Sequence, residues 1–141
     1  MSSDDSSHAD IEIRHRAMQA LRMQLRAVRS ALPESACSSR SSKIAKRVLT
    51  LPELVNARTV LAFASIRNEV RTREIMNGAW AEGKRVALPR VVDDVLSLHV
   101  IEEDTVFTEG AFSVPEPDAR APRLEPSEVD FALVPALAVD P

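Results

Sequence analysis

The stretch Arg58-Thr-Val-Leu-Ala-Phe-Ala-Ser-Ile-Arg-Asn-Glu-Val-Arg-Thr72 decides the fold. Its apolar run from Val60 to Ile66 has β-branched and aromatic members and is too continuous for a strand with one face in water. We therefore predict a strand over 58–66 that is buried on both faces, as in a parallel sheet. Thr72 is a residue type that begins helices and Gly83 is one that ends them, so a helix is predicted over 72–82.

Glu69 lies in the polar loop between this strand and this helix. In open α/β sheets such a loop stands at the carboxyl edge, where ligands bind. Two interpretations of Glu69 remain open. Its carboxylate could cap the loop or pair with Arg67, Arg71 or Arg73, or it could accept hydrogen bonds from N–H groups of a ligand.

The totals fit one soluble globular domain of 141 residues. We expect a disordered Ser/Asp-rich tail over 1–9 and a single domain over 10–141. A net charge of −3 gives no basic field, so no nucleic-acid partner is expected. Cys37 is the single cysteine, and there is no apolar run of membrane-spanning length and no signal sequence. These features favour a cytoplasmic monomer without a membrane partner.

The leading segment is predicted to be helical over 9–32, with an apolar stripe that is buried. The members of the stripe recur at spacings of three and four: Met18, Leu21, Leu25, Val28 and Leu32. Arg22, Arg26 and Arg29 follow the same rhythm one residue later and form a basic ridge beside it. The ridge is either a solvated flank or an anion site, because arginine forks suit phosphate and carboxylate.

The remaining elements alternate between helix and strand. After a serine-rich break we predict a helix over 42–51, strands over 84–89 and 96–101 with a turn at Asp93-Asp94 between them, and a last apolar run over 129–139. Residues 105–128 carry four prolines and are predicted to be a long ordered loop. This order predicts an α/β fold with three layers, in which a mostly parallel sheet is flanked by helices.

The chain carries no motif for covalent or zinc chemistry. Its three histidines are scattered, no serine stands in a nucleophile elbow, and its three glycines are too far apart to form a phosphate cradle. We therefore assign no catalytic residue from the residues alone. They indicate an α/β domain with an anion-friendly helix, at Arg22, and one acidic residue at the sheet edge, Glu69.

Five stretches in this order resemble one known family. They are Leu21-Arg22-x-x-x-Arg26-x-x-Arg29, Ser65-Ile-Arg-Asn-Glu69-Val-Arg-Thr72-Arg-Glu-Ile75, Gly83-Lys84-Arg-Val86-Ala-Leu-Pro89, Glu109-Gly110-Ala-Phe-Ser-Val-Pro115-Glu116-Pro117 and Val129-Asp130-x-x-Leu133-Val134-Pro135-Ala136-Leu-Ala-Val-Asp140. Together they resemble the 5-formyltetrahydrofolate cyclo-ligase family, also called methenyltetrahydrofolate synthetase, over roughly residues 18–140.

The resemblance implies a ligase that uses ATP and Mg²⁺ to convert 5-formyltetrahydrofolate to 5,10-methenyltetrahydrofolate. It implies that Arg22 contacts ATP, and that Met18 stands where the family has a nucleotide-contacting lysine. It also implies that Glu69 and Ala64 line the folate site. Such a reaction needs positioning and charge neutralisation more than a protein nucleophile, which agrees with the lack of a nucleophile motif.

The chain departs from the family pattern in several places. Ser113 and Ala136 stand where glycine is common, and the family segment R-L-G-x-G-x-G-Y-Y-D, with its phosphate cradle and magnesium ligand, is expected soon after Asp140. Relative to the family, the sequence is C-terminally truncated, and we expect no metal ligand in it and little ring closure by the 141 residues alone. The alternatives are an inactive folate- or nucleotide-binding remnant and an α/β interaction module.

Overall fold

The computed structural model describes residues 4–110 and 113–139. The chain forms two compact units, of which the first combines residues 1–32 with 136–141 and the second spans Pro33–Pro135. The single domain over 10–141 stays a prediction. The predictions that fall on residues 1–3, 111–112 and 140–141 lie outside the described residues.

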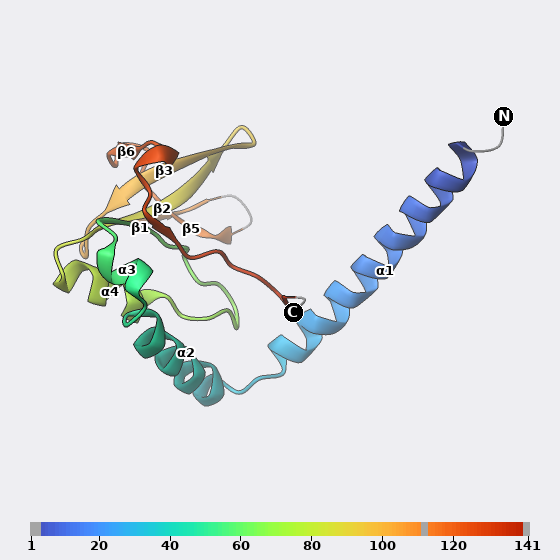
Figure 1. Cartoon of the computed structure of the whole chain (residues 1–141), viewed down its shortest axis with the longest axis horizontal. Coiled ribbons are helices and arrows are strands. Elements are labelled where there is room, and N and C mark those ends of the chain that lie inside the picture. Colours follow the sequence, from blue (N-terminus) through green and yellow to red (C-terminus); the bar gives the residue numbers. More distant parts are fainter. Residues whose placement is uncertain (1–3, 111–112, 140–141) are drawn as a thin grey trace. The chain divides into compact units, whose positions relative to one another are not determined.

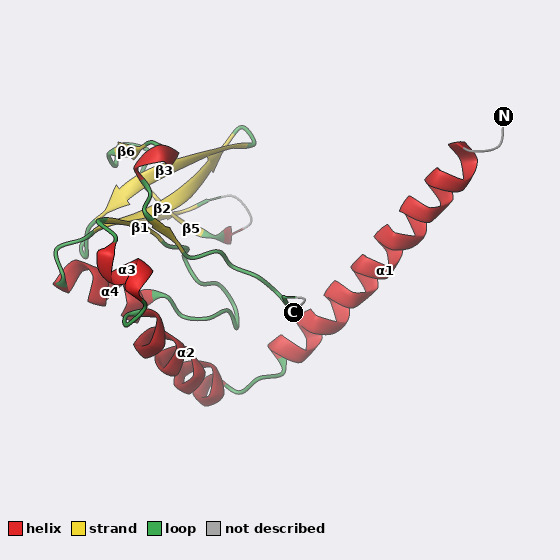
Figure 2. Ribbon diagram, in the orientation of Figure 1, coloured by secondary structure: helices red, strands yellow, loops and turns green. Residues whose placement is uncertain are grey.

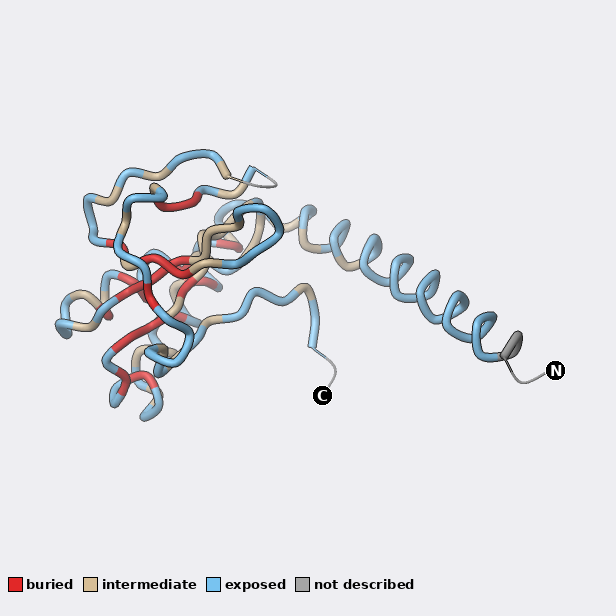
Figure 3. Tube along the Cα trace, turned by 90° about the horizontal axis from the view of Figure 1, so that it is seen from above, coloured by how far each residue is buried: buried red, intermediate tan, exposed pale blue. Residues whose placement is uncertain are grey.

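The first unit contains the helix α1, Asp4–Ser30. It begins five residues earlier than predicted, so residues 4–8 of the expected disordered tail are helical, because extending a formed helix costs little per residue. The apolar stripe is exposed rather than buried: Met18, Leu21 and Val28 have exposed fractions of 52%, 46% and 61%. Spacing defines which residues share a face but not whether that face is covered. Figure 3 shows the exposure along most of the helix.

The second unit is built on a five-stranded sheet with the order β6-β3-β2-β1-β7 (Figures 1 and 2). The strands are β1 Thr59–Leu61, β2 Arg85–Val92, β3 Val95–Ile101, β6 Arg123–Leu124 and β7 Phe131–Ala132. β1 pairs in parallel with β2 and β7, whereas β3 pairs antiparallel with β2 and β6. The predicted α/β class is confirmed, but the sheet is mixed rather than mostly parallel.

The antiparallel half of the sheet comes from a tight hairpin. Asp93 and Asp94 join β2 to β3 with φ of 49° and 59°, the left-handed conformations of a two-residue hairpin turn. Aspartate tolerates these angles better than most residues. Residues 105–128, predicted as one long loop, contain β4 Phe107–Glu109, β5 Pro115–Pro117, β6 and the 3-10 turn η2 Pro126–Glu128. Strands this short leave little periodicity in a sequence.

Helices cover one face of this sheet. α2 (Glu34–Val48), α3 (Pro52–Asn56) and α4 (Arg73–Ala81) lie on the same side of it in Figure 1. Their buried residues join strand residues in the main core. This core is Ala45, Leu54, Ala57, Val60, Ala62, Ile75, Met76, Ala79, Val86, Leu88 and Ile101. A smaller cluster of Ala87, Leu98 and Leu124 marks the opposite face. Within residues 33–135, the helices therefore form one layer.

The segment β1–α4–β2 has the predicted order of strand, helix and strand. Gly83, with φ of 71°, follows the last turn of α4 as predicted. Thr72 occupies the N-cap position, but its side chain makes no capping hydrogen bond. The regular strand is shorter than predicted, with three residues, because the chain leaves the sheet ladder after Leu61 and Ala62 to build the loop described below.

The serine-rich stretch that we expected to break the chain is helical. α2 begins at Glu34, after Pro33, and continues through the serines to Val48. Ser41 is buried, and its Oγ accepts a hydrogen bond of 3.0 Å from the backbone N–H of Arg71. A serine inside a helix can thus accept a hydrogen bond from a neighbouring loop. Local helix propensity does not predict such a distant contact.

The small sheet of β4 and β5 contacts β2 through Glu116. The carboxylate of Glu116 is buried, accepts the N–H of Val91 at 3.1 Å and lies 3.8 Å from Nη1 of Arg90. A Cβ on Gly110 would come within 2.1 Å of this carboxyl group. Gly110 is therefore required for the close approach of the Glu116 side chain.

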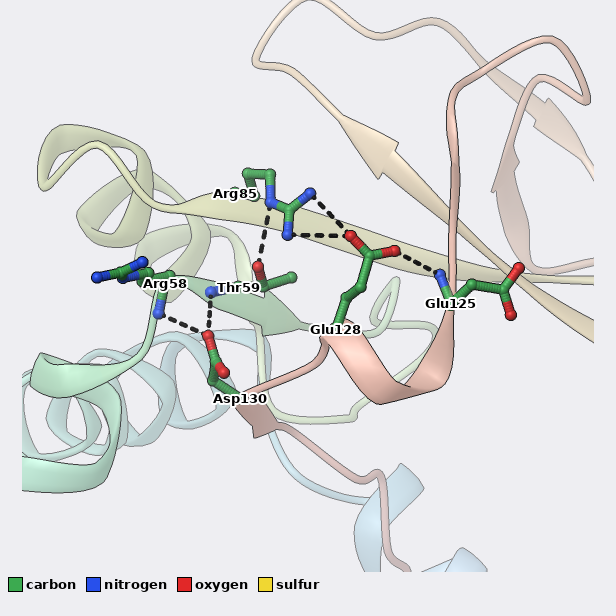
Figure 4. A network of polar contacts seen from close by, with 6 residues as sticks. All are labelled: Arg58, Thr59, Arg85, Glu125, Glu128 and Asp130. Carbon is green, nitrogen blue, oxygen red and sulfur yellow. Dashed lines mark hydrogen bonds and ion pairs between the residues drawn. The ribbon is translucent and has the colours of Figure 1, made fainter.

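A polar network ties the start of β1 to the last strand (Figure 4). Oδ2 of Asp130 accepts the N–H groups of Arg58 and Thr59 at 2.9 and 3.0 Å. These backbone hydrogen bonds lower the pKa of Asp130. Beside it, Glu128 accepts the N–H of Glu125 at 2.9 Å. This contact, with the Arg85 guanidinium, lowers the pKa of Glu128. The predicted Val129–Asp130 segment thus orders the edge of the sheet.

Candidate functional site

A pocket of about 470 Å³ opens at the carboxyl end of β1, where the sequence placed the site. Ala64 and Ser65 line it after the strand, and Thr72, Arg73 and Met76 line it from the start of α4. Its other lining residues are Arg67, Arg71, Leu88, Phe107 and Pro115. All of them belong to the second unit, so one compact body builds the whole pocket.

Ser65 and Thr72 hold the loop between β1 and α4 in place. Oγ1 of Thr72 donates to the carbonyl of Phe63 at 2.6 Å, and the N–H of Thr72 donates to Oγ of Ser65 at 3.1 Å. Oγ of Ser65 donates to the carbonyl of Val70 at 2.7 Å. Thr72 is buried, so its two bonds fix groups that have little access to water. The loop is therefore preorganised.

Glu69 serves this loop directly. Its Oε2 accepts the N–H of Ile66 at 3.0 Å, while its own N–H donates to the carbonyl of Ile66 at 3.1 Å. Of the two interpretations, loop capping is present in the structure. A carboxylate offers about four acceptor positions. Loop capping is thus compatible with a contact between Glu69 and a ligand N–H, and that contact stays a prediction.

The arginines of the loop give the pocket a positive rim. Arg71 forms an ion pair with Glu34, and this hydrogen bond raises the pKa of the Arg71 guanidinium. Arg73 lies over the ring of Trp80, 5.2 Å from its centroid. Arg67 is exposed and has φ of 52°, a conformation that costs free energy in a residue other than glycine.

The apolar wall of the pocket was not predicted. It combines Met76 and Leu88, both buried, with Phe107 and Pro115 from the small β4–β5 sheet. Phe107 and Pro115 stand in or near the fourth family-like stretch, but their spacing alone does not indicate which site they face. With its positive rim, this wall suits a flat ligand that carries oxygen or negative charge.

The predicted nucleotide contacts lie elsewhere in the chain. Arg22 and Met18 are exposed residues of α1 and belong to the first unit. Their roles stay predictions. Within residues 4–110 and 113–139, no group of three His, Cys, Asp or Glu side chains could hold a metal ion. In the same ranges, no helix combines the length and apolar character needed to cross a membrane.

A model of the 5-formyltetrahydrofolate cyclo-ligase family matches residues 14–141. A probable 5-formyltetrahydrofolate cyclo-ligase of Schizosaccharomyces pombe is 30% identical over 132 residues, which cover 87% of this chain and 65% of that protein. The 5-formyltetrahydrofolate cyclo-ligase of Saccharomyces cerevisiae is also 30% identical, over 86% of this chain and 66% of its own length. The chain thus spans just under two thirds of these relatives.

Solved structures agree with the fold. The 5,10-methenyltetrahydrofolate synthetase of Aquifex aeolicus superposes with a TM-score of 0.76 at 28% identity, over 85% of this chain and 61% of that one. The synthetase of Mycoplasma pneumoniae, at 22% identity, has a TM-score of 0.60 over 83% of this chain and 62% of that one, and supports the fold alone. The resemblance predicted from the five stretches is confirmed: the chain belongs to the 5-formyltetrahydrofolate cyclo-ligase family.

Proposed function

We propose that this chain acts in the ATP-dependent conversion of 5-formyltetrahydrofolate to 5,10-methenyltetrahydrofolate, and that the pocket at the end of β1 binds the folate. One observation carries the proposal. A preorganised loop at the carboxyl end of β1 faces an apolar wall across a pocket of about 470 Å³, a volume within the usual range for small-molecule sites.

The pocket residues fit the parts of a folate. The side chains of Met76, Leu88 and Phe107 offer apolar surface to a flat pterin ring, and Ala64 is small enough to leave room beside it. Glu69 would accept ring N–H groups of the pterin, because a carboxylate has about four acceptor positions. The positive rim would attract the negative charge of the substrate.

These residues would act by holding and orienting the folate. ATP, when bound, supplies the chemistry that activates the formyl oxygen, so that N10 can attack the formyl carbon. A rigid pocket raises the rate of such an internal attack by fixing the reacting groups close together, without a protein nucleophile. The apolar wall would also exclude water from the activated carbon.

For ATP we propose Arg22 on α1, with Met18 at the position of the family lysine. An exposed guanidinium on a helix is free to form the paired hydrogen bonds that phosphate accepts. The described residues offer no cluster that fits Mg²⁺, and we derive no step through it. The cytoplasm and a monomeric state remain proposals from the sequence.

Binding measurements on the 141-residue chain test the folate assignment directly. We expect Glu69→Gln to weaken 5-formyltetrahydrofolate binding about tenfold, since a hydrogen bond to a charged group is worth roughly 1.5 kcal/mol or more. We expect Ala64→Leu to weaken it by about the same factor, because the larger side chain fills the pocket. Glu53→Gln, an exposed residue of α3, is the matched control and should bind normally. Isothermal calorimetry gives the dissociation constants.

The same titration with ATP separates the two ligands. Arg22→Ala should weaken ATP binding and leave folate binding unchanged, whereas Arg14→Ala on the same helix should affect neither. If Glu69→Gln and Arg22→Ala weakened both ligands equally, the two role assignments would be wrong. If Ala64→Leu left folate affinity intact, the folate would not occupy this pocket.

A further inference from the structure

A second pocket, of about 310 Å³, lies on the helix-covered face of the same sheet near the tip of the β2–β3 hairpin. Four polar side chains line it: Arg90, Ser97, His99 and Arg123. The strand register puts all four on one face, because Arg90 pairs with Ser97 and His99 pairs with both Arg123 and Leu88. Leu88 also lines the pocket at the end of β1, so the two pockets share this face.

The two arginines flank the pocket from opposite sides. β3 lies between β2 and β6, so Ser97 and His99 of β3 have Arg90 on one side and Arg123 on the other. Neighbouring strands are about 4.8 Å apart, and Ser97 and His99 are separated by a rise of about 7 Å, which together put the two arginine backbones roughly 12 Å from each other. Long side chains at this separation can converge on one small group.

The polar contacts around Arg90 leave it with unused donor capacity. Its Nη1 donates to the carbonyl of Pro117 at 2.9 Å, and Oε2 of Glu116 lies 3.8 Å away, but its buried Nε–H has no acceptor among the described residues. A buried donor without a partner costs free energy that a bound oxygen can recover after a small shift of the side chain.

His99 and Ser97 form a fixed floor between the arginines. Nδ1 of His99 lies 2.8 Å from the carbonyl of Ala121, and because a carbonyl only accepts, Nδ1 carries the hydrogen. Nε2 of His99 lies 2.9 Å from Oγ of Ser97. His99 is buried, and its contact with the carbonyl of Ala121 ties the loop before β6 to the pocket.

We propose that this arginine pocket binds a carboxylate on a short chain. The buried Glu116 offsets the charge of Arg90, so Arg123 leaves about one positive charge uncompensated, which matches one carboxylate better than a dianionic phosphate. Guanidinium forks pair with carboxylates through two parallel hydrogen bonds. Val92 and Val95 add an apolar rim that suits the methylene groups of a short chain.

Two sources can supply this carboxylate. One is the acidic end of a ligand whose ring occupies the pocket at the end of β1, since Arg90 lies two residues beyond Leu88 on β2, a rise of about 7 Å. The other is a separate small acid. The first source rests on the proposed folate function, whereas the carboxylate site itself does not.

Nitrogen-15 NMR titrations of the full chain with glutarate and with inorganic phosphate test the site. Glutarate should shift amides of β2, β3 and β6 around the pocket, and phosphate should bind more weakly. Arg123→Gln, at an exposed position, should raise the dissociation constant for glutarate at least fivefold. Ala119→Glu should do the same, because it places a competing carboxylate on the pocket wall without removing an arginine.

Arg120→Gln is the matched control. Arg120 is the neighbour of Ala119, pairs with Asp118 outside the pocket, and should leave glutarate binding unchanged. The amide spectra show that each variant is folded. Glutarate binding that survives both pocket variants, or that Arg120→Gln weakens equally, overturns the proposal. Phosphate binding more tightly than glutarate overturns the carboxylate assignment.

Competition identifies the source. Displacement of glutarate by 5-formyltetrahydrofolate, but not by its analogue without the glutamate, supports the ligand's own acidic end. Displacement by neither supports a separate acid. If glutarate binds through Arg123 while 5-formyltetrahydrofolate does not bind at all, the proposed folate function fails and the carboxylate site stands.

Discussion

The helix α1 and the start of β1 are stabilised in opposite ways. In α1, the described side-chain bonds join residues four apart, as in the pair of Glu12 and Arg16 at 2.7 Å. At β1, Asp130 bonds the N–H groups of Arg58 and Thr59, more than 70 residues earlier in the chain. Exposed i,i+4 pairs contribute only about 0.3–0.5 kcal/mol. The second unit, residues 33–135 and here called the α/β unit, thus depends on distant partners, whereas the bond of Glu12 and Arg16 in α1 is local.

This difference decides where a substitution should be costly. In the α/β unit a side chain often satisfies a backbone group of another element, so its loss leaves a buried donor or acceptor unpaired. In α1, water can form most of the hydrogen bonds that an exposed side chain loses on substitution. Substitutions at Gly110, at Asp130 and on the stripe of α1 test this contrast, with expected effects that decrease in that order.

Gly110→Ala should destabilise the α/β unit most. The new Cβ would lie 2.1 Å from Cδ of Glu116, whose buried carboxylate is held by Val91, so the β4–β5 sheet must move away from β2. We expect a loss of about 2–3 kcal/mol of unfolding free energy, from overpacking and a weakened buried hydrogen bond. Urea unfolding followed by circular dichroism measures it.

Gly78→Ala is the matched control for this change. Its Cβ would meet the Leu49 side chain, 2.6 Å from Cδ2, which can shift by rotation about its side-chain bonds, and alanine adds about 1 kcal/mol of helix propensity in α4. The net effect should stay within about 1 kcal/mol. In the double variant Gly110→Ala/Glu116→Ala, the two changes should be coupled by at least about 1 kcal/mol. Additive losses would mean that Glu116 does not require Gly110.

Asp130→Asn should destabilise the α/β unit less, and in a pH-dependent manner. Hydrogen bonds from Arg58 and Thr59 lower the pKa of Asp130 in the folded protein, so its ionised form contributes stability that is present above the unfolded pKa of about 3.9. This contribution is lost as the pH falls through the lower folded pKa. The difference in unfolding free energy between wild type and variant should therefore be widest near pH 7 and should narrow as the pH falls below about 4.

Unfolding curves at pH 7, 5 and 3 measure this gap. Arg58→Gln is the control, because the hydrogen bond to Asp130 comes from the Arg58 backbone and not from its side chain. This variant should lose only the smaller coulombic contribution of the Arg58 guanidinium, so its loss of stability at pH 7 should be much smaller than that of Asp130→Asn. A gap for Asp130→Asn that stayed constant from pH 7 to pH 3 would contradict the network in Figure 4.

The local parts of the fold were predictable from the sequence. The apolar run after Arg58 and the stop at Gly83 predicted the β1–α4–β2 unit, and Asp93-Asp94 predicted the hairpin turn. Each depends on residues close together in the chain, where hydrophobic period and backbone preference act. The site at the carboxyl edge followed from this order, and Ala64 does line the pocket there.

The parts that failed depend on distant partners. The serines of α2 suggested a break because their tendency to bond local backbone opposes helix, yet Ser41 instead accepts from Arg71. The short strands β4, β5 and β6 acquire their ladder bonds only in the folded sheet. The apolar wall of Leu88 and Phe107 is assembled from separate elements, so no local spacing indicates it.

The stripe of α1 gives the smallest expected effect and the sharpest test of the contrast. Met18→Ser and Leu21→Ser change side chains with exposed fractions of 52% and 46%, and surface substitutions usually alter stability by no more than about 0.5 kcal/mol. Ala45→Ser in α2, fully buried, is the control and should cost more, since its hydroxyl would enter the core. A loss above about 1 kcal/mol from either α1 change would mean that the stripe is covered in solution. The original prediction of a buried seam would then be correct, and α1 would depend on distant contacts as β1 does.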